Sequence, residues 1–205
     1  MIFSIIGIQI KKDLGLNDTQ FGLLIATPVL SGSLLRIFLG VWADQIGGRK
    51  VLTGVMLAGA AATWLLTQAQ TYPQFLLAAL GVGIAGSSFS VGVAYVSKWF
   101  PPEKQGTALG IFGAGNIGSA VTKLLAPMVM VAAGWMMVAK LWAVGLAVTA
   151  IVFYLLSKED HSLEERRRSG VKPMPFAEQM APLKNLQVWR FSLYYFFVFG
   201  GFVAL

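Results

Sequence analysis

Apolar runs long enough to cross a membrane constrain this sequence more than any other feature. Five such runs cover residues 21–43, 51–69, 74–97, 106–133 and 136–156, and short polar turns separate them. A helix of about 20 apolar residues crosses the hydrocarbon layer of a bilayer. Hydrophobic residues make up 56% of the 205-residue chain and charged residues only 12%. The sequence therefore predicts an all-α membrane protein surrounded by a lipid bilayer.

Shorter apolar segments lie at both ends of the sequence. Residues 1–10 are too few to cross a bilayer, and residues 191–205 begin another apolar helix. The charged, proline-containing stretch between the bundle and that last helix predicts a water-exposed linker, with a short amphipathic helix around residues 176–183. We therefore expect a transmembrane bundle over residues 1–156 with a truncated first helix, a linker over 157–190, and the start of a seventh membrane helix over 191–205.

Lysine and arginine gather in particular connections between the spans. The connections at residues 44–50, 98–104 and 157–190 hold eleven of the sixteen basic residues. Basic residues concentrate on the cytoplasmic side of membrane proteins, so we expect these connections to be cytoplasmic and the chain to be a multi-pass protein of the cytoplasmic membrane. Because these residues do not line one polar face, the net charge of +7 does not indicate nucleic acid.

Few residues in the sequence suit metal binding or catalysis. The chain has no cysteine, and its single histidine, His161, lies in a charged stretch that predicts a solvated loop. The predicted spans contain no acid-base pair and no nucleophile beside a base. We therefore expect no metal, no cofactor and no enzymatic activity.

Two glycine patterns, at residues 81–86 and 113–118, match the spacing of a dinucleotide-binding loop. Neither follows a strand, and each lies within a membrane-length apolar run, which argues against a nucleotide site. Glycines at this density let membrane helices approach closely. We expect close helix contacts at both patterns, with Asn116 directed into one of them.

Apart from Lys140, near the start of the last span, Arg36 and Lys123 are the charged residues that fall within the predicted spans, and all nine acidic residues fall outside them. A cation in hydrocarbon costs roughly 2.5–3.5 kcal/mol on insertion scales, so it normally faces a cavity or a partner. The partner can be a backbone carbonyl, a group elsewhere in the protein or an anionic substrate, and a long side chain can also reach the membrane interface. We favour an anionic substrate.

Two motifs carry a resemblance to a known family. The turn GVWADQIGGRK resembles the loop between the second and third helices of the major facilitator superfamily, where an aspartate and basic residues latch the cytoplasmic helix ends. FGAGNIGSAVTKLLAP resembles the nitrate signature of the nitrate/nitrite porter family. The first motif falls on Gly40, Asp44, Gly47, Gly48 and Arg49, and the second on Gly113, Gly115, Asn116 and Gly118. The resemblance covers the whole chain and implies the N-terminal six-helix half of a major facilitator fold plus the start of a seventh helix.

The resemblance also implies roles for single residues. The family's substrate arginine falls on Arg36, its signature asparagine on Asn116, its enclosing aromatics on Phe89 and Phe199, and its hydrogen-bonding tyrosine on Tyr195. A planar guanidinium suits a flat, delocalised anion such as nitrate. Lys123 resembles a subgroup associated with proton-linked nitrate uptake. It would either exchange a proton during transport or attract the anion as a permanent charge.

Transport is the activity that the resemblance implies. It is the secondary active transport of nitrate, nitrite or both by alternating access, as proton/nitrate symport or nitrate/nitrite antiport. A carrier of another small anion or an organic solute is the alternative. The implied partners are the anion, protons, the lipid bilayer, and a C-terminal half that supplies the family's second arginine.

Overall fold

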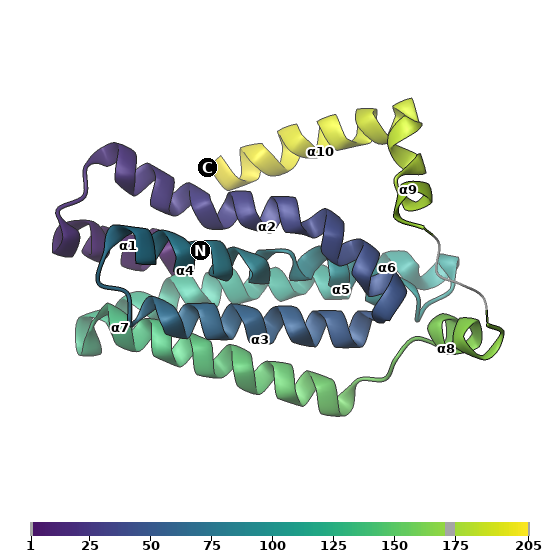
Figure 1. Cartoon of the computed structure of the whole chain (residues 1–205), viewed down its shortest axis with the longest axis horizontal. Helices are drawn as coiled ribbons and strands as arrows, with labels where there is room; N and C mark the ends of the chain where they lie inside the picture. Colours follow the sequence, from purple (N-terminus) through teal and green to yellow (C-terminus); the bar gives the residue numbers. More distant parts are fainter. Residues whose placement is uncertain (1, 171–174, 205) are drawn as a thin grey trace. The chain divides into compact units, whose positions relative to one another are not determined.

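The computed structural model describes residues 2–170 and 175–204, although the side chains at 2–4, 161, 162, 164, 167, 177, 199 and 202–204 are not described. It divides the chain into two units, Met1–Ser169 and Gly170–Leu205. Throughout the described residues the regular structure is helical, as the sequence predicts (Figure 1). The first unit holds α1 (Ile2–Leu14), α2 (Asp18–Ile46), α3 (Gly48–Leu66), α4 (Tyr72–Gly86), α5 (Ser88–Ser97), α6 (Pro102–Gly113), η1 (Ala114–Asn116), α7 (Ile117–Leu156) and α8 (His161–Arg168). The second holds α9 (Phe176–Gln179), η2 (Ala181–Lys184) and α10 (Leu186–Ala204).

Local chemistry explains where α1 ends and α2 begins. The sequence predicts a polar turn from residue 11, but α1 continues to Leu14 and ends at Gly15, whose φ of +60° suits glycine. Asn17 then caps α2: its side chain accepts a hydrogen bond from the Gln20 amide at 2.8 Å, and its own amide donates to Gln20 Oε1 at 3.2 Å. The turn in the structure, residues 15–17, is therefore shorter than the predicted one.

The predicted fourth and fifth spans both lie within residues 102–156, and Gly134 separates them. Gly134 has φ +80° and ψ 167°, which interrupts α7. Trp142 Nε1 donates to Thr122 Oγ1 at 3.0 Å. In one straight helix these two residues would lie about 30 Å apart, so the chain must reverse direction between them. The two spans therefore form a hairpin with a very short turn, which confirms the prediction.

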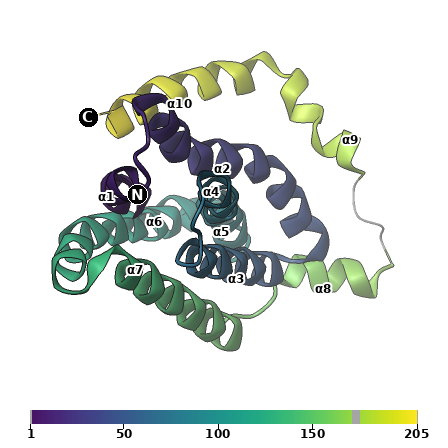
Figure 2. The ribbon, with the colours of Figure 1, turned by 60° about the vertical axis from the view of Figure 1, so that its left-hand side comes forward.

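Two hydrophobic clusters stabilise the first unit. Figure 2 shows its helices in a view turned by 60° from that of Figure 1. One cluster joins α1, α2, α3, α4 and α7 through Ile6, Ile10, Leu16, Leu24, Leu66, Phe75, Ala79, Ala126, Trp135 and Val138. The other joins α2, α3 and α5 through Leu39, Ala43, Val51, Val55 and Val91. Because α3 packs on α2, α4 and α7, it connects the two clusters.

The outer surface of the first unit is apolar. Val29, Leu77, Leu124 and Leu155 are each more than two-thirds exposed, and Val131 is 88% exposed. Among the described residues, Asp18–Ile46, Tyr72–Ser97 and Pro102–Leu156 are long and apolar enough to cross a membrane. Exposing so much apolar surface to water would be unfavourable, whereas lipid or further membrane helices would cover it.

The predicted linker is more structured than its composition suggests. Asp160 caps α8 by accepting a hydrogen bond from the Leu163 amide at 2.8 Å. His161, predicted to lie in a loop, is instead the first residue of this helix. The expected short helix near residue 180 is present as α9 followed by η2.

Candidate functional site

Arg36 lies on α2, half-buried against the C-terminal end of α4. Its Nη2 atom donates to the Gly86 carbonyl at 3.4 Å. Its Nε atom is buried and has no hydrogen-bond partner in the described part of the chain. One of the partners considered from the sequence, a backbone carbonyl, is therefore present, and it uses only part of the donor capacity of the guanidinium.

Phe89 follows Gly86 by three residues, in the first turn of α5, and is 39% exposed. Its ring lies 5.5 Å from the ring of Phe112, on α6, measured between centroids. A methyl group at Gly92 would overlap the Phe112 ring, so the ring rests directly on that glycine. The sequence reasoning missed Phe112, although Phe112 immediately precedes the signature glycine Gly113.

The signature motif forms the short 3-10 turn η1 between α6 and α7. Asn116 is exposed, its backbone carbonyl accepts a hydrogen bond from Ser119 Oγ at 2.7 Å, and its side-chain amide has no partner among the described residues. A methyl group added at Gly113, Gly115 or Gly118 would meet nothing within 4 Å. The described residues of the first unit therefore do not make the expected close helix contact at these three glycines.

The other glycine pattern does make the expected contact. A methyl group at Gly81 would lie 2.6 Å from the side chain of Ala62 on α3, and one at Gly83 would overlap the backbone of α2. The structure therefore confirms the close packing at residues 81–86 and explains why these positions lack side chains.

Lys123 lies on α7, seven residues beyond Asn116 and so on nearly the same face of the helix. Its side chain is exposed and forms no ion pair or hydrogen bond within the described chain. Tyr195 and Phe199 belong to α10 in the second unit, where Tyr195 is 53% exposed and the Phe199 side chain is not described. The first unit thus links Arg36, Phe89 and the signature turn through Gly86 and Phe112.

Charged contacts gather where α2 ends, at the Asp44 end of the bundle. Asp44 pairs with Lys98 at 2.7 Å, and the same ammonium lies 3.5 Å from the buried carboxylate of Asp160. Arg166, on α8, donates to the Asp44 carbonyl at 3.3 Å. The aspartate of the turn motif is therefore connected to α5 and to the start of the predicted linker.

The remaining residues of the turn motif contact the end of α7. Arg49 donates through Nε to the Tyr154 carbonyl at 3.0 Å, and its guanidinium lies 4.2 Å from the Tyr154 ring centroid. Its amide donates to Glu159 Oε1 at 3.3 Å. Gly47 has φ +117°, and a methyl group there would overlap the Glu159 carboxylate. A methyl group at Gly48 would lie only 2.7 Å from the Tyr95 ring, whereas one at Gly40 would meet nothing within 4 Å.

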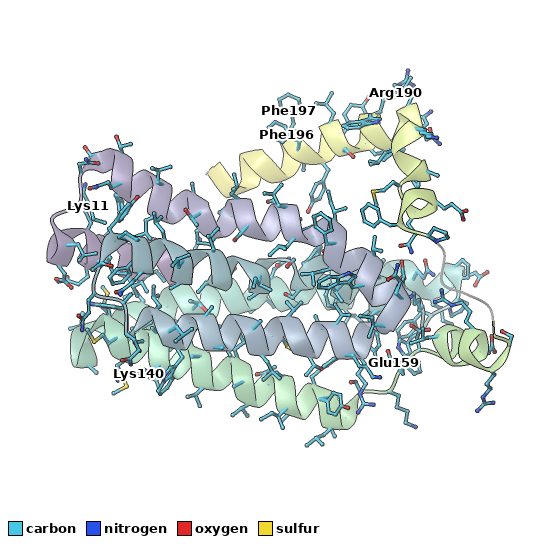
Figure 3. All side chains as sticks on the ribbon, viewed as in Figure 1. Lys11, Lys140, Glu159, Arg190, Phe196 and Phe197 are labelled. Atoms are coloured by element: carbon cyan, nitrogen blue, oxygen red, sulfur yellow. The ribbon has the colours of Figure 1, made fainter. Side chains whose placement is uncertain are left out.

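The opposite end of the bundle has its own polar contacts. Figure 3 shows Lys11 and Lys140 at that end and Glu159 at the Asp44 end. Lys11 pairs with Asp18 at 2.5 Å, and Trp135 Nε1 donates to Asp13 at 3.1 Å. Within the described residues, no group of three His, Cys, Asp or Glu side chains is placed to hold a metal ion.

Comparison with known proteins shows which family this chain matches. The model of the Major Facilitator Superfamily matches residues 1–205. The chain is 39% identical to the "Probable nitrate/nitrite antiporter NarK1" of Thermus thermophilus, with 100% of this chain and 48% of that protein aligned. It is 34% identical to the "Nitrite extrusion protein" of Bacillus subtilis, with 96% of this chain and 48% of that protein aligned. It is 36% identical to the "Probable nitrate transporter NarT" of Staphylococcus carnosus, with 95% of this chain and 49% of that protein aligned. The chain therefore spans about half the length of these curated relatives.

Proposed function

Because the chain belongs to the Major Facilitator Superfamily, we propose that it forms the N-terminal half of a carrier that moves nitrate or nitrite across the cytoplasmic membrane. The names of its relatives support this substrate class. Carriers of this kind expose a central site to the two sides of the membrane in turn, by movement of one half against the other. Such a mechanism requires substrate contacts from both halves.

The Arg36 guanidinium is the observation that carries the proposal. It is a full positive charge on a membrane helix, its Nε donor is buried without a partner in the described structure, and its one hydrogen bond is a long one to a neutral carbonyl. An anion would satisfy the remaining donors and offset the charge. Nitrate and nitrite are small and planar enough to accept two parallel hydrogen bonds from a guanidinium.

In this proposal the neighbouring side chains shape the rest of the site. Phe89 offers an apolar ring to one face of a weakly hydrated anion, and the free amide of Asn116 offers a hydrogen bond. Lys123 either exchanges a proton, as in proton/nitrate symport, or adds a permanent positive charge, as suits nitrate/nitrite antiport.

Uptake by the full-length transporter in proteoliposomes tests the proposal. Nitrate accumulation should saturate and should be inhibited by nitrite but not by an equal concentration of sulfate or phosphate, which demand more hydrogen-bond donors than this site offers. Uptake of an organic solute that is unaffected by nitrate would instead support the alternative, a superfamily carrier with another substrate. Vesicles without protein give the background.

A further inference from the structure

A close backbone contact between α2 and α4 lies about one helical turn from Arg36. The two helices run in the same direction, with Tyr72 Oη of α4 donating to the Gln20 carbonyl of α2 at 3.1 Å near their first turns. Further along, Ser31 Oγ donates to the Leu80 carbonyl at 3.0 Å. These contacts fix which residue of α4 faces which residue of α2.

Glycines bring the two backbones together beside this hydrogen bond. A methyl group at Gly32 would lie 2.6 Å from the Gly83 carbonyl oxygen, and one at Gly83 would overlap both Ser31 Oγ and the Pro28 carbonyl. The obstacles are mostly backbone atoms, which a side-chain rotation cannot move. Any side chain at Gly83 must therefore push α2 and α4 apart.

Arg36 follows Gly32 by four residues, and Gly86 follows Gly83 by three, so their contact lies about one turn beyond the glycine contact. We propose that Ser31, Gly32 and Gly83 are positioning residues that hold the Arg36 guanidinium against the Gly86 carbonyl and leave its other donors directed at the anion. This inference rests on the proposed function, since it assigns these residues to the same anion site. It adds a role for three residues that do not themselves contact the anion.

The test compares Gly83→Ala and Ser31→Ala with two matched controls, Gly22→Ala on α2 and Gly54→Ala on α3, where a methyl group meets nothing within 4 Å. Each variant is made in the full-length transporter, and nitrate affinity is measured on purified protein. We expect Gly83→Ala to weaken nitrate binding by about tenfold or more, Ser31→Ala by a smaller factor, and both controls to bind normally. Ser31→Ala adds no bulk, so it remains informative if Gly83→Ala fails to fold.

A second readout requires no anion. Modification of Arg36 by an arginine-selective dicarbonyl reagent, followed by peptide mass spectrometry, reports how accessible the guanidinium is. We expect it to react several-fold faster in Gly83→Ala than in wild type and the controls. Faster modification in a transporter that does not bind nitrate would refute the proposed function and keep the positioning role. Unchanged nitrate affinity and unchanged modification in both variants would overturn the positioning role.

A double-mutant cycle separates positioning from general damage to the fold. If Ser31 acts through the guanidinium, Ser31→Ala should weaken nitrate binding much less in an Arg36→Lys background than in wild type. Equal losses in the two backgrounds would show that Ser31 acts independently of Arg36, contrary to the proposal.

Discussion

Lys98 Nζ lies 2.7 Å from Asp44 Oδ1, which ties the residue after α5 to the last turns of α2. The same ammonium lies 3.5 Å from Asp160, whose side chain is 2% exposed. Removing the ammonium takes a cation away from a buried carboxylate, whereas Asp44→Asn removes only the more exposed partner. We expect Lys98→Ala to lower the free energy of unfolding by about 1–3 kcal/mol, and more than Asp44→Asn does.

Thermal denaturation of the purified full-length transporter measures this difference, with about 1–2 °C expected per kcal/mol in a protein about twice the length of this chain. Lys50→Ala is the control, because Lys50 is exposed beside the same turn. If Lys98→Ala and Lys50→Ala melt at the same temperature, the Lys98 cluster does not stabilise the Asp44 end.

Membrane topology can be tested by cysteine labelling, because the chain has no native cysteine. We expect the Asp44 end to be cytoplasmic, since the basic connections gather there. A membrane-impermeant thiol reagent added outside intact cells should label a cysteine at Gln70 but not one at Lys50. Both positions are exposed, whereas a side chain at Gly48 would press on Tyr95. Labelling of the Lys50 position alone would reverse the topology.

Arg36→Lys tests whether the guanidinium or only its charge is required. Lysine cannot donate two parallel hydrogen bonds to a planar anion, and a charge-assisted hydrogen bond contributes about 1.5–3 kcal/mol. We expect nitrate affinity to fall by about tenfold or more in the full-length transporter, almost as far as in Arg36→Gln. An arginine that only reached the membrane interface would accept lysine, so normal affinity would rule out the anchor role.

The contact between Phe89 and Phe112, on α6, should also affect nitrate affinity. Phe112→Leu removes a ring contact of about 0.5–1.5 kcal/mol, so we expect roughly two- to tenfold weaker nitrate binding. Gly92→Ala should act in the same direction, because its methyl group overlaps the Phe112 ring. Gly110→Ala is the control, since a methyl group there meets nothing within 4 Å. Normal binding by both test variants would remove Phe112 from the site.

Lys123 should affect proton coupling more than anion recognition. Its ammonium has no protein partner in the described chain, so replacing it with glutamine breaks no contact there. We expect Lys123→Gln to flatten the pH dependence of nitrate uptake by the full-length transporter and to leave the preference among anions intact. Lys104→Gln, at an exposed site outside the spans, is the control. An unchanged pH profile for Lys123→Gln would exclude a coupling role.

Hydropathy and motifs predicted much of the first unit from the sequence alone. The apolar runs located the membrane helices, and the gap between the runs 106–133 and 136–156 located the turn at Gly134. The structure differs at polar helix ends. Lys11 and Lys12 remain helical because a helix end exposed to water accepts charged residues, and Gly15 ends α1. α8 was missed because its residues show no apolar period and it depends on the Asp160 cap.

The site was harder to predict, because its contacts join residues far apart in the sequence. The motifs singled out Arg36 and Asn116, but the Arg36–Gly86 hydrogen bond spans 50 positions and depends on how α2 and α4 pack. Both glycine patterns have the same spacing, yet among the described residues of this unit only the glycines at 81–86 lie closely against another helix. Spacing alone does not reveal which neighbour a helix face will meet.

The turn at Gly134 has a consequence for biosynthesis. The interruption in α7 is a single residue with φ +80°. The two spans are therefore not separated by a polar loop that could stay in water after the first span has entered the bilayer. We therefore expect the segments on either side to enter the bilayer together as a helical hairpin, which the Trp142–Thr122 hydrogen bond of the folded structure would stabilise. A substitution at residue 134 that disfavours positive φ should therefore reduce the amount of protein inserted into the membrane more than it reduces the activity of the molecules that insert.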